Sequence, residues 1–466
     1  MDAHIGSGDG VEAVKHLVTK AEEWIHRNYQ TLLFPPSPRR TLDLKTARLT
    51  SVTHQFTYSV LSQTLKQCGF DGLPKLLTDL AIMRIVEPCS KLHSVELLEQ
   101  YFGVHWTPVT VYRNLSKLKL QKDDAEKKAV ACAQTLLHDN LSLVLYDVTT
   151  LYFETFKEND DLRKRGFSKD HKENQPQIVV GLLVTGQGFP VGYEVFEGNA
   201  FEGHTMLPVL KDFSTKHSVK TPTVVADAAM ISLDNVKALK KEGYSYIVGA
   251  RLANCPTDIL EIIKAAAQEE NSAVRLPTDR GDLICMYSST RYRKDRHEMD
   301  KQLAKAKTLI AKNEPGRRAK FVVSGKNICI LNEDLKKKAE ILLGWKGYYT
   351  NIPESVLSNI EIMTQYKQLW HVEQAFRMAK SDLETRPIFH RKEDAIRAHI
   401  LICFVALCIG KYLEIKTSRS LQNIRNLLWS ISDAHIVDTE TSDVIVLRSE
   451  PNEEVKLLLK TLEMSY

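Results

Sequence analysis

The sequence predicts an α/β fold with a mixed sheet, and two patterns along the chain support this class. Three short runs rich in branched residues, "LSLVLYDV", "QIVVGLLV" and "FPVGYEVF", follow one another from residue 141 and are separated by turns such as "TGQG", which is typical of a three-strand meander. Helices expected at about 205–215 and 232–241 then alternate with the strands "TVVAD" and "YSYIVGA". Such an alternation places helices against the faces of a sheet.

The chain before this sheet, residues 1–135, is expected to be a helical region that binds DNA. Apolar residues recur every three or four positions in "HQFTYSVLSQTLKQCGF" and "LPKLLTDLAIMRIVEP", as in amphipathic helices. Two more helices are expected on either side of a turn at Gly103, the second opened by Thr107. This pair is either a plain helical hairpin with a solvated basic face or a helix-turn-helix with three side chains exposed to DNA: Tyr112, Arg113 and Lys117.

Residues 251–345 interrupt the alternation and are expected to form a basic insertion domain. Residues 291–320 hold 11 lysines and arginines against 4 acids, and this surplus is larger than the net charge of +5 of the whole chain. Such a surplus is typical either of a surface that faces phosphates or of a solvated helix. Both interpretations stay open at this point.

The composition limits the class of protein. The 466 residues are 43% hydrophobic and 26% charged, which argues against a disordered chain and suffices for about two to four packed units. The longest apolar run, 400–409, is about half of the ~20 residues that a membrane span needs, so no membrane partner is expected. The eight cysteines include no C-x-x-C pair and are expected to be reduced core thiols. We therefore expect a cytoplasmic protein.

Two predicted strands end on an aspartate. Asp147 follows the apolar run "LVLY", and Asp227 follows "TVVA". A single aspartate in this position is often a turn or cap residue. Two of them in one α/β unit are costly because like charges repel, unless a divalent cation offsets them. Hard oxygen ligands favour Mg²⁺ or Mn²⁺.

A third acid, Glu373, lies on a predicted helix, "TQYKQLWHVEQAFRMAKSDLETRP". Tyr366, Glu373 and Lys380 are spaced by seven residues, so on a continuous helix they line up. They follow the edge of an apolar stripe formed by Leu369, Val372, Phe376, Ala379 and Leu383. Glu373 on its own is typical of a surface glutamate that pairs with Arg377, but its alignment with Tyr366 and Lys380, after two strand-end aspartates, favours a metal ligand.

With these motifs, the sequence resembles the DDE transposases of bacterial insertion sequences, in the branch with the signature Y-x2-R-x3-E-x6-K. Tyr366, Glu373 and Lys380 match its spacing, "YDVTT" and "VVADAAM" are similar to the first and second acid motifs, and "GFPVGYEVFEGNAFEGHT" is similar to the segment between them. The resemblance covers about residues 140–410. Leu369 stands where the signature has an arginine. We therefore expect Arg377, together with Lys380, to bind the DNA phosphate in its place.

The resemblance implies an RNase H-like core and a two-metal polynucleotidyl transferase. It implies that Asp147, Asp227 and Glu373 hold two Mg²⁺ or Mn²⁺ ions, and that Tyr366 and Lys380 contact DNA near the cleaved phosphate. The implied partners are the terminal inverted repeats of the element and target DNA, both double-stranded, bound by a homodimer. The expected location is the nucleoid of the bacterial cytoplasm.

The expected organisation places the catalytic core in two parts. The first part is residues 136–250, the basic insertion follows at 251–345, and the second part, with the Glu373 helix, is 346–415. Residues 416–466 are expected to be a C-terminal tail. Two other functions use the same residues: a host RNase H-like nuclease that inserts nothing, and a transposase-derived regulator that binds DNA without cutting it.

Overall fold

The computed structural model describes residues 6–28, 45–155, 157, 162–167, 172–230, 232–311, 319–324 and 329–465. The chain divides into two compact units. The smaller unit combines Met1–Ser51 with Ala434–Leu447, and the larger combines Val52–Asp433 with Arg448–Tyr466.

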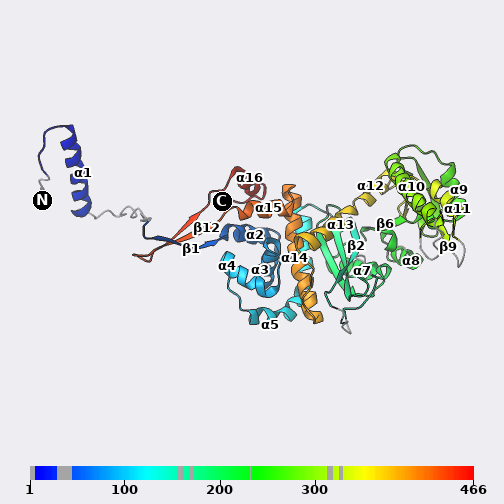
Figure 1. Cartoon of the computed structure of the whole chain (residues 1–466), viewed down its shortest axis with the longest axis horizontal. Helices are drawn as coiled ribbons and strands as arrows, with labels where there is room; N and C mark the ends of the chain where they lie inside the picture. Colours follow the sequence, from blue (N-terminus) through cyan, green and yellow to red (C-terminus); the bar gives the residue numbers. More distant parts are fainter. Residues whose placement is uncertain are drawn as a thin grey trace. The chain divides into compact units, whose positions relative to one another are not determined.

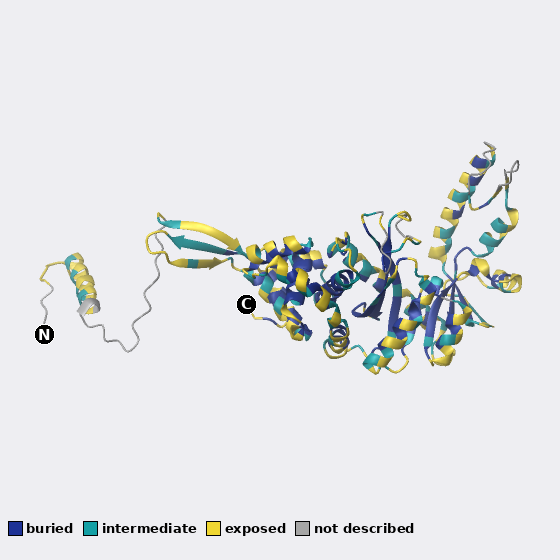
Figure 2. Ribbon diagram, turned by 90° about the horizontal axis from the view of Figure 1, so that it is seen from below, coloured by how far each residue is buried: buried dark blue, intermediate teal, exposed yellow. Residues whose placement is uncertain are grey.

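The smaller unit holds a helix and most of a three-stranded sheet. The helix is α1 (Val11–Asn28), and the strand order is β1-β12-β13, with β1 at Ala47–Thr53, β12 at Asp433–Asp438 and β13 at Val444–Arg448. The β1 strand lies in the region that we expected to be helical. Five consecutive residues of β1 are exposed (Figure 2), so its sequence lacks the apolar alternation by which a strand is recognised.

The larger unit is built on an eight-stranded sheet with the order β4-β3-β2-β5-β6-β11-β8-β7. Its strands are β2 (Leu143–Tyr152), β3 (Gln177–Thr185), β4 (Pro190–Glu197), β5 (Thr223–Ala226), β6 (Ser245–Ala250), β7 (Ala273–Thr278), β8 (Gly281–Tyr287) and β11 (Trp345–Thr350). The first three form the predicted antiparallel meander. The β5 and β6 strands run parallel to β2. The predicted mixed sheet of RNase H-like type is thus confirmed.

Helices cover both faces of this sheet (Figure 1). On one face, the Tyr146 hydroxyl of β2 donates a hydrogen bond to Thr205 Oγ1 at 2.8 Å, just before α7 (Met206–His217). The α8 helix (Leu233–Lys241) connects β5 to β6. The opposite face packs against α13 (Trp370–Arg377) and α14 (Glu393–Thr417).

The α14 helix is the central helix of the larger unit. By length and composition it could cross a membrane, but 89% of its most apolar window is buried inside the protein. In Figure 1 it lies between the sheet and a group of helices from the N-terminal region. These are α2 (Gln55–Gln67), α3 (Lys75–Val86), α4 (Lys91–Phe102) and α5 (Pro108–Leu118). The helix α6 (Lys122–Leu136) contacts both α14 and the strand β4. The apolar side chains of α14 are therefore satisfied by the protein itself.

The end of the chain is more ordered than the tail that we expected. It forms α15 (Leu421–Trp429) and α16 (Glu453–Thr461) in addition to β12 and β13. Both helices bury apolar side chains against the main core, and α15 contacts α2 and α14. The short amphipathic pattern of these helices carries little signal on its own, because helices of nine residues depend on tertiary packing.

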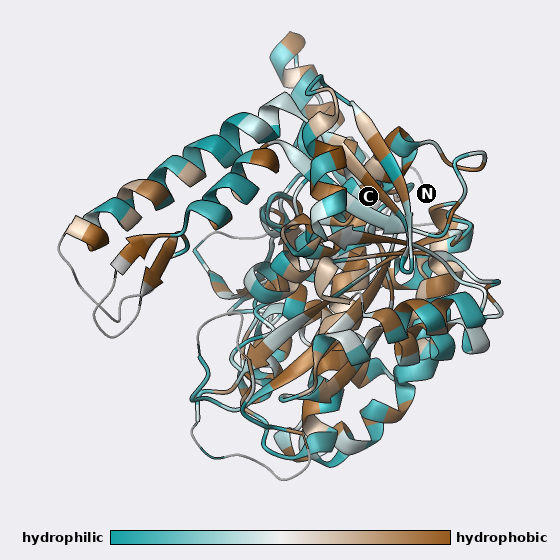
Figure 3. Ribbon diagram, turned by 90° about the vertical axis from the view of Figure 1, so that its right-hand side faces the viewer, coloured by the Kyte–Doolittle hydropathy of each residue, from teal (hydrophilic) through white to brown (hydrophobic). Residues whose placement is uncertain are grey.

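The insertion is only partly a separate structure. Its strands β7 and β8 continue the core sheet beyond β11, whereas α9 (Thr257–Ala265), α10 (Ser289–Ala311), α11 (Glu333–Ile341) and the hairpin of β9 (Val322–Ser324) and β10 (Cys329–Leu331) project from it. The long α10 helix is largely hydrophilic (Figure 3). Of the basic stretch at 291–320, α10 covers the part up to Ala311, and residues 312–318 lie outside the described residues.

Candidate active site

The two predicted aspartates belong to neighbouring strands. Asp227 directly follows β5, as predicted. The prediction that Asp147 ends its strand is wrong, because β2 continues to Tyr152 through further buried residues and Asp147 lies inside it. The register between β2 and β5 pairs Tyr146 with Ala226, and Asp147 and Asp227 follow these residues directly. Neighbouring strands lie about 4.8 Å apart, and side chains in one row point to the same face of the sheet. Asp147 is half-buried and Asp227 is exposed. The fold thus places two carboxylates side by side, as their positions in the sequence predicted.

Glu373 approaches from a helix that is not continuous, contrary to our expectation. The predicted helix is divided into α12 (Asn359–Lys367) and α13, which begins at Trp370. At the junction, the amides of Leu369 and Val372 bond to carbonyls three residues back instead of four, so the chain is wound more tightly there. Glu373 is exposed in the first turn of α13, and it forms no ion pair with Arg377 in the described part of the chain.

Tyr366 joins the helix to the acids. Its hydroxyl donates a hydrogen bond to Asp227 Oδ1 at 3.3 Å. The pKa of Tyr366 is raised by burial and by the charges of Asp227 and Glu373, so the hydroxyl remains a donor. The ring has room because residue 249 is a glycine, where a Cβ would lie 2.5 Å from the Tyr366 oxygen.

These residues line one pocket of about 730 Å³. Asp147, Asp227, Tyr366 and Glu373 lie on its walls, together with groups that the sequence analysis did not assign to the site: Glu270, Tyr287, Arg291, Lys294, Lys346, Tyr348 and Trp370. Lys346 had a usable signal, because it is a charged residue within the otherwise apolar strand "WKGYYT". That is the same signal that marked the two aspartates.

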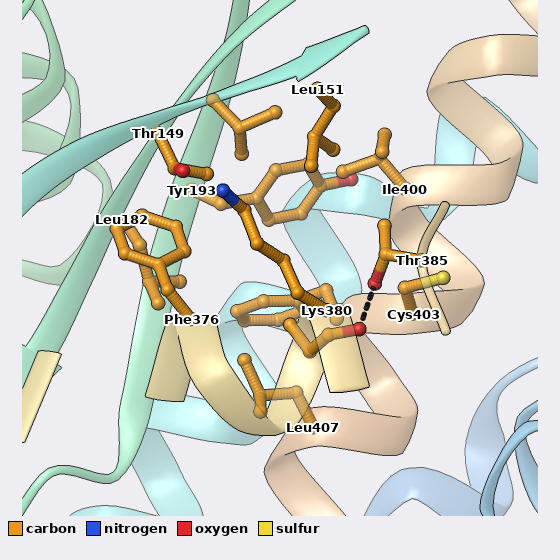
Figure 4. A pocket seen from close by; sticks show the side chains of 13 residues that line it. Thr149, Leu151, Leu182, Tyr193, Phe376, Lys380, Thr385, Ile400, Cys403 and Leu407 are labelled. Carbon is orange, nitrogen blue, oxygen red and sulfur yellow. Dashed lines mark hydrogen bonds between the residues drawn. The ribbon is translucent and has the colours of Figure 1, made fainter. Parts of the chain in front are cut away.

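Lys380 occupies a different place. It lines a small apolar pocket of about 40 Å³ between the sheet and the helices α13 and α14. Figure 4 shows its side chain extending into this pocket beside Thr149 and Tyr193. A π-helical turn, Met378–Asp382, carries Lys380 and adds a residue to the turn. The extra residue changes the regular spacing on which the predicted line of Tyr366, Glu373 and Lys380 depends.

Leu369 and Arg377 lie at the two ends of α13. Leu369 is buried against the core and contacts the pocket. Arg377 is exposed at the end of α13 and is not among the residues that line the pocket. Lys380 lines the neighbouring apolar pocket, which also contacts β2, and the contact of Arg377 and Lys380 with DNA stays a prediction.

The chemistry of the carboxylates suits a hard divalent ion, because all three supply oxygen ligands. Among the residues that the structure describes, no three histidine, cysteine, aspartate or glutamate side chains form a ready-made metal cluster. The three acids therefore line a common pocket from three different elements, but their side chains are not gathered around one metal position. The seven cysteines whose side chains are described are free.

The candidate DNA-binding helices have the predicted form. α4 ends at Gly103, which adopts a left-handed conformation with φ 64°. α5 is capped by Thr107, whose side chain accepts a hydrogen bond from the Thr110 amide. Tyr112, Arg113 and Lys117 are exposed on α5. Their exposure agrees with both earlier interpretations, a helix-turn-helix and a solvated hairpin.

The chain is similar to known transposases. Residues 139–409, more than half of the chain, match the family model described as "Transposase DDE domain". No curated protein matches the chain. Among solved structures, the chain is similar to one titled "Cryo-EM structure of piggyBac transposase synaptic complex with hairpin DNA (SNHP)", with a TM-score of 0.40 and 10% sequence identity, covering 80% of this chain and 76% of that chain.

Proposed function

Because the chain belongs to the family of transposase DDE domains, we propose that it binds the terminal inverted repeats of its own insertion sequence and catalyses metal-dependent DNA cleavage and strand transfer. One observation carries the proposal. Asp147 of β2 and Asp227, which directly follows β5, lie side by side on one face of the sheet, and Glu373 lines the same pocket. A pocket of about 730 Å³ has room for a phosphodiester group.

In this proposal the three carboxylates hold two Mg²⁺ or Mn²⁺ ions. When bound, such ions activate the attacking oxygen and stabilise the leaving oxygen of an in-line displacement. The chain itself orients one of the ligands, because the Tyr366 hydroxyl donates to Asp227 Oδ1. Hydrolysis of one phosphodiester bond frees a 3′-OH at the end of the element. This 3′-OH then attacks a phosphodiester of target DNA, and one phosphorus–oxygen bond forms as another breaks.

Double-stranded DNA is the partner in this proposal. Joining two element ends in one reaction suggests a homodimer on DNA, and the exposed residues Tyr112, Arg113 and Lys117 of α5 are candidates for recognising the ends. The place of action would be the bacterial nucleoid.

The test removes one acid at a time. Asp147→Asn, Asp227→Asn and Glu373→Gln should each reduce Mg²⁺-dependent cleavage to background, because each removes a metal ligand, while binding to the element's ends persists through phosphate contacts. The matched control is Asp234→Asn, which alters an exposed aspartate on α8 outside the pocket. Near-parental cleavage by any one of the three variants would remove that residue from the triad.

The same assay separates the other functions. Strand transfer and hydrolysis are measured separately on DNA that carries the inverted repeats flanking the gene. Hydrolysis without strand transfer by the parent chain would indicate a nuclease. Binding without any metal-dependent cutting would indicate a regulator.

A further inference from the structure

The pocket that the three acids line also has a basic wall. We use the name basic wall for Arg291 and Lys294 of α10 together with Lys346 of β11, all of which line this pocket. The sheet brings them together, because β8 and β11 are antiparallel neighbours that pair Tyr287 with Trp345. The end of β8, where α10 begins, therefore lies beside the start of β11.

Lys346 is the member of the wall that the fold holds most closely to the acids. The strand β6 pairs Val248 with Ala226 of β5, so the next residue, Gly249, lies in the same row as Asp227. Gly249 is in turn paired with Tyr348 of β11. Asp147, Asp227 and Tyr348 thus follow one row across the sheet. Lys346 lies two residues before Tyr348 on β11, so both side chains point to the same face.

The surroundings of Lys346 fix its side chain. Its Nζ lies 5.3 Å from the centroid of the Tyr366 ring, the ring whose hydroxyl contacts Asp227. The pKa of Lys346 is lowered, chiefly by burial and also by the nearby charge of Arg291, while Asp227 and Asp295 act in the opposite direction. Among the described residues, no carboxylate forms an ion pair with Lys346.

One carboxylate beside this wall, Asp295, is already engaged. Asp295 accepts from Arg291 Nε at 3.2 Å and from the Gly344 amide at 3.2 Å. Lys346 is thus held in a partly buried place, beside a second cation and without an acid of its own. Such an arrangement is costly in the absence of an anion, and an anion that enters the pocket would relieve the cost.

We propose that Lys346 binds a phosphate oxygen of the DNA strand at the active site and supplies the positive charge that Leu369 cannot provide. This inference rests on the proposed function for the identity of the anion. Lys346 is preferred to Arg377 and Lys380 because it lines the pocket of the acids, whereas Arg377 is not among the pocket's lining residues and Lys380 lines the separate apolar pocket. Lys346 is a phosphate-binding residue in this proposal and not a metal ligand.

The experiment compares Lys346→Gln and Lys346→Arg with Lys240→Gln, which neutralises an exposed lysine on α8. Cleavage is followed on DNA that carries the inverted repeats flanking the gene. Lys346→Gln should lower the cleavage rate about ten- to hundredfold, as expected for the loss of a charged hydrogen-bond partner. Lys346→Arg should recover part of the rate because it keeps the charge, and Lys240→Gln should behave like the parent.

A binding measurement gives a second readout. In the Glu373→Gln background, the slope of log affinity against log salt for a nicked duplex of arbitrary sequence should fall by about 0.9 when Lys346 is replaced by glutamine. A parental slope together with a parental cleavage rate would overturn the inference. If Lys346→Gln does not fold, Lys346→Met, which keeps the length and apolar stem, takes its place in both assays.

The two proposals fail in different ways. A parent chain that cuts no DNA under any metal condition would overturn the proposed function, and the salt slope would still show whether Lys346 contacts a phosphate. A parent chain that cuts and joins DNA, with Lys346→Gln equally active and Arg377→Ala strongly impaired, would assign the phosphate to Arg377 and overturn the inference alone.

Discussion

At the scale of single residues, the site is marked by charges that stand in apolar strands. Asp147, Asp227 and Lys346 each adjoin or interrupt a buried run, and all three line one pocket. Burying a charge costs free energy unless a partner or ligand compensates it. A charge in such a place therefore indicates a function. The two aspartates could be recognised from the sequence by this signal, and Lys346 carried the same signal.

The hydrogen bond from Tyr366 to Asp227 can be tested with two tyrosines of the same pocket. Tyr366→Phe removes the donor to Asp227 Oδ1, whereas Tyr348→Phe removes a hydroxyl that forms no hydrogen bond with the residues that the structure describes. Because Asp227 is exposed, losing this hydrogen bond should cost less than is usual for a bond to a charged group. We expect about 1 kcal/mol, which lowers the cleavage rate about fivefold. Tyr348→Phe should stay within about twofold of the parent in the same kinetic assay. Equal effects of both changes would show that the bond does not orient Asp227.

At the scale of elements, the sequence predicted the strands and their order better than the course of the acidic helix. The strands of the meander have long apolar runs, and their order follows from short connections. The helix predicted at 364–387 was expected to be regular, so that Tyr366, Glu373 and Lys380 would align. The tight junction at Leu369 and the π turn at Met378–Asp382 depend on how α12 and α13 pack against the sheet. No residue such as proline announces either irregularity.

The α10 helix can be tested for non-specific DNA affinity. Lys301, Lys305 and Lys307 are exposed on it, and within the described residues they form no ion pairs. Neutralising all three to glutamine should reduce the slope of log affinity against log salt by up to about 0.9 for each lost phosphate contact. Arg296, which pairs with Asp300 at 3.4 Å, is the control, since its charge is already partly neutralised. An unchanged slope in the triple variant, measured by fluorescence anisotropy, would mean that α10 is merely solvated.

At the scale of the larger unit, the catalytic sheet and the N-terminal helices are joined by a buried cluster of basic groups. His399 of α14 contacts Lys91 of α4 at 3.2 Å through Nδ1 and the Thr385 carbonyl at 3.0 Å through Nε2. Arg84 of α3 donates to the carbonyls of Glu384 and Cys89. Lys91, Arg84 and His399 are almost fully buried. The segment between the π turn and α14 is therefore held to α3 by the hydrogen bond from Arg84 to the Glu384 carbonyl. It is linked to α4 through His399, which contacts both the Thr385 carbonyl and Lys91.

This cluster predicts that the larger unit loses stability in mild acid. Burial and the charges of Lys91 and Arg84 lower the pKa of His390 to about 4, and the same causes, with His390 in addition, lower the pKa of His399 well below its usual value. The thiols of Cys403 and Cys89 are the other titratable groups that influence Lys91. Within the part of the chain that the structure describes, no carboxylate contributes to the pKa shifts of Lys91, His390 or His399.

The sign follows from proton binding in the two states. Between about pH 6.5, the usual pKa of histidine, and about 4, the unfolded chain binds protons that folded His390 does not. The free energy of unfolding therefore falls as pH is lowered through this range. The melting temperature of the parent, followed by circular dichroism from pH 7.5 to 4.5, should decrease, and His390→Gln should flatten part of that decrease. His297→Gln, which alters an exposed histidine on α10, should leave it unchanged. Glutamine does not titrate in this range, so the variant lacks the proton that unfolded His390 binds. A parental profile in the His390 variant would therefore show that His390 does not cause the loss of stability.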